Sequence, residues 1–169
     1  MSKRLYLLRH AKSSWKQPEL ADHERPLAGR GRRAASAIAR YLDEHGVAPA
    51  LVLCSTARRA RETYERIEPA LAAASVRYER QLYAASADTL HERLRSVPDG
   101  IDSVMLIGHN PAIEQLAHDL ARPSPERRAL ETKFPTAALA TLELACASWR
   151  DVDRGGAKLL YVVRPRDLA

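Results

Sequence analysis

Three short apolar runs, each ending in polar residues, constrain the fold of this chain more than any other feature. They occupy residues 3–9, 51–55 and 103–108. Uninterrupted apolar runs of this length are typical of parallel strands that are buried on both faces. Because segments with helical spacing lie between the runs, the chain alternates strand and helix. This order predicts an α/β fold, with a mostly parallel sheet, helices on both faces and right-handed connections.

Four segments show the helical spacing, and each offers one apolar face. The apolar positions of the first two are Ala34, Ala35, Ile38, Tyr41 and Leu42, and then Ala57, Ala60, Tyr64, Ile67 and Leu71. Those of the third are Ala87, Leu90, Leu94 and Val97, and those of the fourth are Ile113, Leu116, Ala117 and Leu120. The fourth helix is predicted to start at Pro111, because proline is favourable at a first helical position.

Beyond Pro135 the pattern changes to two strand-like runs, at 137–145 and 158–163, separated by a polar stretch. We expect them to form antiparallel strands at one edge of the sheet. The fold class predicted from the whole pattern is a three-layer α/β/α sandwich with a mostly parallel sheet and an antiparallel edge. A single domain is expected to span residues 1–169.

The charge balance of the chain favours anionic ligands. It carries 27 Lys and Arg against 21 Asp and Glu, a net charge of +6. The arginines are scattered among glutamates and only 5% of residues are aromatic, whereas nucleic-acid binding calls for a basic stripe with interleaved aromatic side chains. We therefore expect no nucleic-acid partner.

The chain is expected to be cytoplasmic and to have no membrane partner. No apolar run approaches the roughly 20 residues of a membrane helix, and the N-terminal stretch lacks the cleavage site of an export signal. The two cysteines, Cys54 and Cys146, show neither metal-binding nor disulfide spacing and are predicted to be small core residues in a reducing compartment.

Polar residues follow each of the three buried runs. They are Arg9-His10 after the first run, residues 55–59 after the second and residues 108–111 after the third. Ligands of open parallel sheets bind at the carboxyl ends of the strands, where the N-termini of helices also point. The sequence therefore predicts that two histidines and at least two arginines converge on one edge.

This set of residues suits a phosphoryl group. Guanidinium groups match phosphate oxygens in pairs and stay charged, and neutral imidazole is a competent nucleophile toward phosphorus. Fixed cations and a second histidine can stabilise the transferred group without a metal. Metal ligation is the rival use of His10 and His109, but no carboxylate lies at ligand spacing and the adjacent arginines would repel a cation. Neither a metal nor a cofactor is expected.

Several motifs resemble those of the histidine phosphatase superfamily, which has the phosphoglycerate-mutase-like fold. Leu8-Arg9-His10-Ala11 resembles its RHG signature, with Ala11 in place of the usual glycine. Residues 55–63 resemble its SPxxRAxxT stretch, and residues 108–111 resemble its second-histidine motif. Together with Asp22, Arg25-Pro26-Leu27 and Phe134-Pro135-Thr136, these motifs are most similar to the short SixA-type branch, the phosphohistidine phosphatases.

The resemblance implies roles for particular residues. His10 corresponds to the nucleophile, and Arg9, Arg59 and His109 correspond to the phosphate pocket. Arg59 fits the motif better than Arg58 because it directly precedes Ala60 and lies four positions after Ser55, but the sequence leaves both open. Ser13 and Lys12 are further candidate contacts to the anion.

Larger relatives protonate the leaving oxygen with a glutamate, and the corresponding stretch here, Leu82-Tyr83-Ala84, has no carboxylate. Asp22 and Asp88 remain as candidate proton donors. An alkoxide leaving group gains about 10² to 10⁴ in rate from a positioned acid, whereas phosphorylated imidazole leaves from a labile P–N bond. We therefore predict phosphohistidine on a protein as the substrate, and the family resemblance implies a histidine-containing phosphotransfer domain as the partner.

Three other functions stay open. The same nucleophile could serve a phosphatase of small phosphomonoesters, because fold and nucleophile do not fix the substrate. A mutase is less favoured, since so short a chain has little material for a lid that excludes water. A non-catalytic adaptor that recognises a phosphorylated partner is the alternative outside enzymology.

Overall fold

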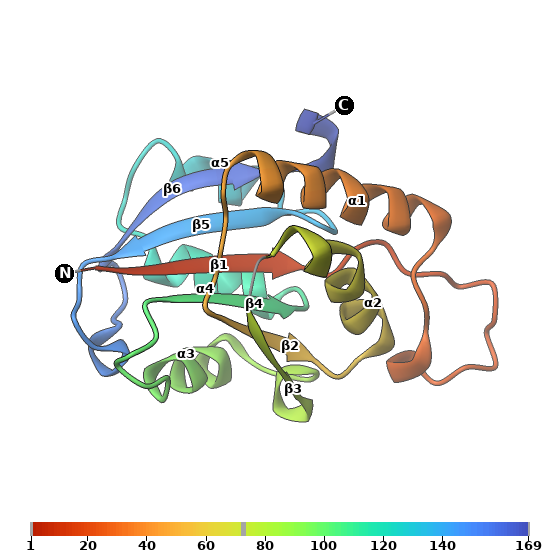
Figure 1. Cartoon of the computed structure of the whole chain (residues 1–169), viewed down its shortest axis with the longest axis horizontal. Helices are drawn as coiled ribbons and strands as arrows, with labels where there is room; N and C mark the ends of the chain where they lie inside the picture. The colour runs from red at the N-terminus through yellow and green to blue at the C-terminus, as the bar shows by residue number, and fades with distance from the viewer. Residues whose placement is uncertain (1, 72–73, 169) are drawn as a thin grey trace.

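The computed structural model describes residues 2–71 and 74–168. In these residues the strands form one sheet with the order β3-β2-β4-β1-β5-β6 (Figure 1). The strands are β1 (Lys3–Arg9), β2 (Leu51–Ser55), β3 (Ser75–Glu79), β4 (Ser103–Gly108), β5 (Leu139–Leu144) and β6 (Ala157–Val163). β1 to β4 are mutually parallel where they pair, and β5 and β6 continue the sheet antiparallel. The predicted parallel sheet with an antiparallel edge is confirmed.

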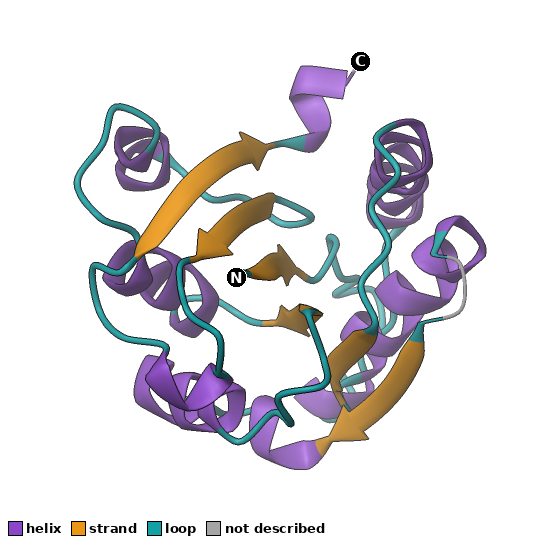
Figure 2. Cartoon of the chain, turned by 60° about the vertical axis from the view of Figure 1, so that its left-hand side comes forward, coloured by secondary structure: helices purple, strands orange, loops and turns teal. Residues whose placement is uncertain are grey.

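Helices cover both faces of this sheet, which confirms the three-layer sandwich (Figure 2). The helices are α1 (Gly29–Glu44), α2 (Arg58–Ile67), α3 (Ala87–Arg95), α4 (Ala112–Leu120) and α5 (Arg127–Thr132). α1 and α2 pack on one face, and α3 and α4 pack on the other. Short 3₁₀ helices, among them η1 (Asp22–Glu24), η3 (Arg80–Leu82), η4 (Trp149–Asp151) and η5 (Pro165–Leu168), lie in the connections.

The two apolar layers explain why the strands are uninterrupted apolar runs. Leu7 and Leu8 follow one another in β1 and point to opposite faces, so Leu7 joins the core under α4 and Leu8 joins the core under α1. Both are fully buried. Each such side chain removed from water stabilises the fold by about 1.5–3 kcal/mol, and this burial holds the carboxyl ends of the strands in place.

Two elements were not predicted from the sequence. β3 is a half-exposed edge strand that pairs only with β2, so it lacks an apolar run. α5 has only six residues and buries only Leu130. The prediction for Cys146 was also wrong in part: Cys54 is buried in β2, but Cys146 follows the end of β5 and is half-buried.

α1 begins in direct contact with the chain that follows β1. A Cβ atom at Gly31 would overlap the carbonyl oxygen of Lys12, and that oxygen also accepts the N–H of Ala28 at 2.8 Å. Only glycine fits so close an approach. Across the described residues, no helix combines the length and apolar character needed to cross a membrane.

Candidate functional site

The pairing of β1 with β4 brings two histidines together. Arg9 pairs with Gly108, so the next residues, His10 and His109, leave the sheet side by side at its carboxyl edge. Their ring centroids are 5.0 Å apart. The predicted convergence of these two strand ends is therefore present in the structure.

A backbone contact orients the His10 ring. Its Nδ1 lies 2.7 Å from the carbonyl oxygen of Ala11, which can only accept, so Nδ1 carries the proton and Nε2 keeps its lone pair. The residue is 7% exposed. Burial lowers the pKa of His10 to about 4, and the charges of Arg59 and Arg9 add to this effect, although the Ala11 carbonyl opposes it. His10 is thus a neutral imidazole with an available Nε2 at physiological pH.

His109 is also held neutral. Burial, followed by the proximity of His10 and Arg59, lowers its pKa to about 3. Its Nε2 lies 2.7 Å from the Ser55 hydroxyl oxygen, at the end of β2. Three parallel strands therefore contribute to one small region of the edge.

Arg59 and Arg9 bring positive charge to the same region. Arg59 lies in the first turn of α2, is 7% exposed, and donates from Nη1 to the Asp22 carbonyl at 2.8 Å and from Nη2 to Asp22 Oδ2 at 3.0 Å. Arg9 donates from Nη1 to the Phe134 carbonyl at 3.1 Å. Both guanidinium charges help to lower the pKa values of His10 and His109, because both lie close to the two rings.

Three buried nitrogens of this cluster have no hydrogen-bond partner within residues 2–71 and 74–168. They are Nε of Arg9, Nε of Arg59 and Nδ1 of His109. Unpaired buried polar atoms are rare because each costs about 1–3 kcal/mol. Two of the three are obligatory donors, so the cluster is suited to an oxyanion. We call His10, His109, Arg9 and Arg59 the phosphate pocket, after the role that the family resemblance implies for them.

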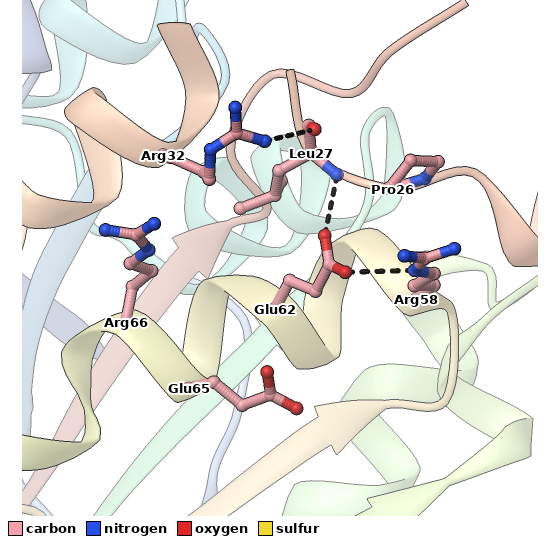
Figure 3. A pocket seen from close by; sticks show the side chains of 7 residues that line it. All are labelled: Pro26, Leu27, Arg32, Arg58, Glu62, Glu65 and Arg66. Carbon is pink, nitrogen blue, oxygen red and sulfur yellow. Dashed lines mark hydrogen bonds and ion pairs between the residues drawn. The ribbon is translucent and has the colours of Figure 1, made fainter. Parts of the chain in front are cut away.

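Arg58 points away from this pocket. Its Nε donates to Glu62 Oε2 at 2.9 Å, and its side chain is 43% exposed. It lines a separate surface cavity together with Pro26, Leu27, Arg32, Glu62, Glu65 and Arg66 (Figure 3). The sequence did not decide whether Arg58 or Arg59 belongs to the site. The structure places Arg59 beside the histidines.

The two candidate proton donors lie in different environments. Asp22, in η1, accepts the Tyr83 hydroxyl at 2.6 Å and the Arg59 and Arg25 guanidinium groups. The Tyr83 hydrogen bond, with help from the arginines, lowers the pKa of Asp22 to about 2. Asp88, in the first turn of α3, is 79% exposed and pairs with Arg154 at 3.0 Å. Only Asp22 therefore contacts the pocket, and there it is a carboxylate at neutral pH.

Ser13 is buried, but its hydroxyl oxygen is taken up by a protein contact. It accepts Arg25 Nη1 at 2.6 Å. The Arg25 guanidinium carbon also lies 3.5 Å from the ring centroid of Trp15, whose side chain is exposed. Ser13 thus helps to hold the 13–25 loop in its conformation. Among the described residues, its hydroxyl forms no hydrogen bond with either histidine of the site.

Comparisons with known proteins agree with this geometry. Residues 5–93 match the histidine phosphatase superfamily (branch 1). The chain belongs to the histidine phosphatase superfamily. It is 38% identical to an uncharacterised protein of Mycobacterium tuberculosis over 94% of this chain and 100% of that protein.

Two solved structures of the superfamily are similar over nearly the whole chain. A protein of Nakamurella multipartitia, provisionally named phosphohistidine phosphatase SixA, superposes with a TM-score of 0.86 and 31% identity, covering 98% of this chain and 97% of that one. A provisionally named SixA of Agrobacterium tumefaciens gives 0.84 and 31%, covering 96% and 98%. These matches confirm the resemblance drawn from the motifs.

Sequence reasoning missed Tyr83 as a member of the site, although it had singled out the stretch around it. In this histidine phosphatase the centroid of the Tyr83 ring lies 5.6 Å from the centroid of the His109 ring and 5.9 Å from the Arg59 guanidinium carbon. The Asp22 carboxylate raises the pKa of Tyr83, so its hydroxyl stays protonated. Tyr83 therefore contacts the site from the stretch in which the family resemblance implies the acid of larger relatives.

Two further contacts that the sequence did not reveal hold the backbone of this histidine phosphatase at the pocket. Thr63 Oγ1 accepts the N–H of Ala11 at 3.0 Å and donates to the Arg59 carbonyl at 2.7 Å. Ala137 has φ 63°, and its N–H donates to the carbonyls of Arg9 and His10, both at 3.1 Å. The left-handed conformation costs an alanine about 1–2 kcal/mol. The surrounding packing holds Ala137 in this conformation.

The part of the chain that the structure describes contains no group of three or more His, Cys, Asp or Glu side chains placed to hold a metal ion. Metal independence stays a prediction.

Proposed function

We propose that this protein is a phosphohistidine phosphatase in which His10 Nε2 takes the phosphoryl group from a phosphorylated protein and passes it to water. The observation that carries the proposal is the His10 ring, which is neutral and fixed by Ala11 with Nε2 available. Unpartnered arginine nitrogens lie in the same pocket. A nucleophile beside cationic donors is the combination that phosphoryl transfer requires.

In the first step the lone pair of His10 Nε2 attacks phosphorus, and the P–N bond to the substrate imidazole breaks. The substrate ring takes the electron pair of that bond. When its other nitrogen already carries a proton, the ring leaves as neutral imidazole and needs no acid from the enzyme. Phosphorylated His10 keeps its Nδ1 proton, and the Ala11 carbonyl stabilises the resulting positive ring.

In the second step a water molecule attacks phosphorus and the bond to His10 Nε2 breaks. The imidazole returns to its neutral state, and both hydrogens of the water leave with inorganic phosphate as H₂PO₄⁻. Arg9, Arg59 and His109 hold the oxygens of the transferred group in both steps. Because these donors are already fixed, they need little reorganisation as charge develops.

We assign Asp22 a positioning role. With a pKa of about 2 it is ionised at neutral pH, so it is a poor proton donor in the free enzyme. Its carboxylate instead holds Arg59 through Oδ2 and Tyr83 through the same atom. Asp88, paired with Arg154, has no part in the proposed mechanism.

The test compares wild type and His10→Ala on a phosphohistidine peptide, with release of inorganic phosphate as the measurement. We expect the variant to lose at least about 10³ in kcat, because no other group replaces the nucleophile. Trapped wild-type enzyme is expected to carry acid-labile, base-stable phosphate that His10→Ala lacks. His45→Ala, which removes an exposed histidine, is the matched control and is expected to behave as wild type.

Three outcomes would contradict the proposal. Much faster hydrolysis of sugar phosphates would assign the pocket to small phosphomonoesters. An isomeric product in place of inorganic phosphate would indicate a mutase. Stable binding of the phosphopeptide without turnover would indicate an adaptor.

A further inference from the structure

A basic groove lies beside the phosphate pocket at the carboxyl edge of the sheet. Its volume is about 220 Å³, and it is lined by the start of α1, the 133–136 segment and the 164–166 segment that leads into η5. Five of its lining residues are cationic: Lys12, Arg30, Lys133, Arg164 and Arg166. Within the described part of the chain, no aspartate or glutamate lines the groove.

The groove and the phosphate pocket are built from neighbouring segments of the chain. Lys12 comes two residues after His10, and its carbonyl contacts the first turn of α1. On the other side, Pro135 follows Phe134, whose carbonyl accepts Arg9. The segment that carries His10 and the segment that holds Arg9 therefore both continue directly into the lining of the groove.

The cations of the groove fall into two kinds. Arg164 is structural, because it donates to the carbonyls of Lys133 at 3.0 Å and Ala129 at 2.9 Å and so fixes the wall. Lys12, Arg30, Lys133 and Arg166 are exposed. Among the described residues these four form no ion pair, in contrast to Arg93, which pairs with Glu79 at 2.7 Å. Their charge is available to a ligand.

We propose that this groove binds an acidic segment of the phosphorylated protein, next to the phosphohistidine. The inference takes its phosphohistidine substrate from the proposed function. The residues that line the groove, however, are separate from those of the phosphate pocket. Charge complementarity across such a surface chiefly raises the association rate and selects partners. Acidic protein is favoured over single-stranded nucleic acid because the lining has no aromatic side chain on which bases could stack.

The experiment uses two synthetic phosphohistidine peptides, one with aspartate and glutamate flanking the phosphohistidine and one with asparagine and glutamine at the same positions. We expect wild type to have a kcat/KM about tenfold higher on the acidic peptide. The double variant R30E/R166E is expected to lose this preference through KM, with its rate on the neutral peptide retained. R122E/R150E is the matched control, because Arg122 and Arg150 are also exposed and lie toward the opposite end of the sheet.

An unchanged preference in R30E/R166E, or an equal loss in R122E/R150E, would overturn the groove assignment. A separate measurement distinguishes this failure from failure of the proposed function. Fluorescence anisotropy with the unphosphorylated acidic peptide requires no turnover. Binding that only R30E/R166E loses supports the groove even if neither phosphopeptide is hydrolysed, and binding that both double variants retain refutes it. Tighter binding of a single-stranded oligonucleotide, lost in R30E/R166E, would assign the groove to nucleic acid instead.

Discussion

The phosphate pocket and the basic groove lie side by side at one edge of the sheet, yet they use positive charge in opposite ways. In the pocket, Arg59 is 7% exposed and is held by hydrogen bonds to the carbonyl and the carboxylate of Asp22. In the groove, Lys12 and Arg30 are exposed to solvent. A buried cation must have fixed partners to offset its desolvation, whereas an exposed cation keeps its hydration and its mobility.

This difference separates two tasks of the proposed protein phosphohistidine phosphatase. Fixed, desolvated donors stabilise charge in the transition state, so their loss should lower kcat on every substrate. Solvated cations raise the rate at which an acidic partner associates, so their loss should change KM only for acidic partners. The following measurements test this division, from the largest expected effect to the smallest.

The largest effect is expected from Arg59→Ala. Removing one preorganised donor of this kind typically costs about 10² to 10³ in rate. Arg58→Ala is the matched control, since it removes an adjacent arginine that is exposed and paired with Glu62, and we expect its kcat/KM to stay within about threefold of wild type. Steady-state kinetics on phosphoramidate measures both. Equal losses would show that position in the pocket does not distinguish the two residues.

A change of pH is expected to have an intermediate effect, on the protonation of His10 and on the free energy of unfolding. The His10 pKa lies at about 4, against 6.5 for a free imidazole, so His10 stays neutral and competent as the pH falls to about 5 and is protonated near 4. Because the folded pKa is lowered, the unfolded chain binds more protons between pH 6.5 and 4. His10 therefore contributes stability above about pH 6.5 that is lost as the pH falls toward 4.

Nuclear magnetic resonance of the imidazole nitrogens measures this titration directly, with His10→Ala assigning the signal. A midpoint near 6.5 would contradict a desolvated ring. Inorganic phosphate is expected to raise the His10 pKa, because a bound anion favours the charged imidazole.

The smallest effect is expected from ionic strength. The Debye length falls from about 10 Å at 0.1 M to about 3 Å at 1 M, so salt should weaken the exposed groove and leave the buried pocket nearly unchanged. We expect kcat/KM on the acidic phosphohistidine peptide to fall several-fold over this range, with little change on phosphoramidate. A similar fall on both substrates would remove the distinction between the two regions.

The sheet could be predicted from the sequence because burial on both faces demands unbroken apolar runs in β1, β2 and β4. The same argument explains why β3 was missed, since an edge strand that is half-exposed needs no such run. α5 was missed for a related reason, as one buried leucine in six residues leaves no periodicity to detect.

The positions of His10 and His109 were predictable because strand register alone makes them neighbours. Asp22 and Tyr83 were harder to place, since they come from loops 61 positions apart and meet only through a hydrogen bond. The sequence also could not indicate that Ser13 would be engaged by Arg25, because that contact depends on how the 13–25 loop folds back. Loop conformation, rather than periodicity, decides such contacts.

Gly31 links the two regions in a way that concerns substrate length. Its lack of a side chain lets α1 approach the Lys12 carbonyl, and Arg30, the residue before it, belongs to the groove wall. That one close backbone contact therefore sets where Arg30 lies relative to the chain that follows His10. A partner would be selected by how many residues separate its acidic side chains from its phosphorylated histidine, as well as by its charge.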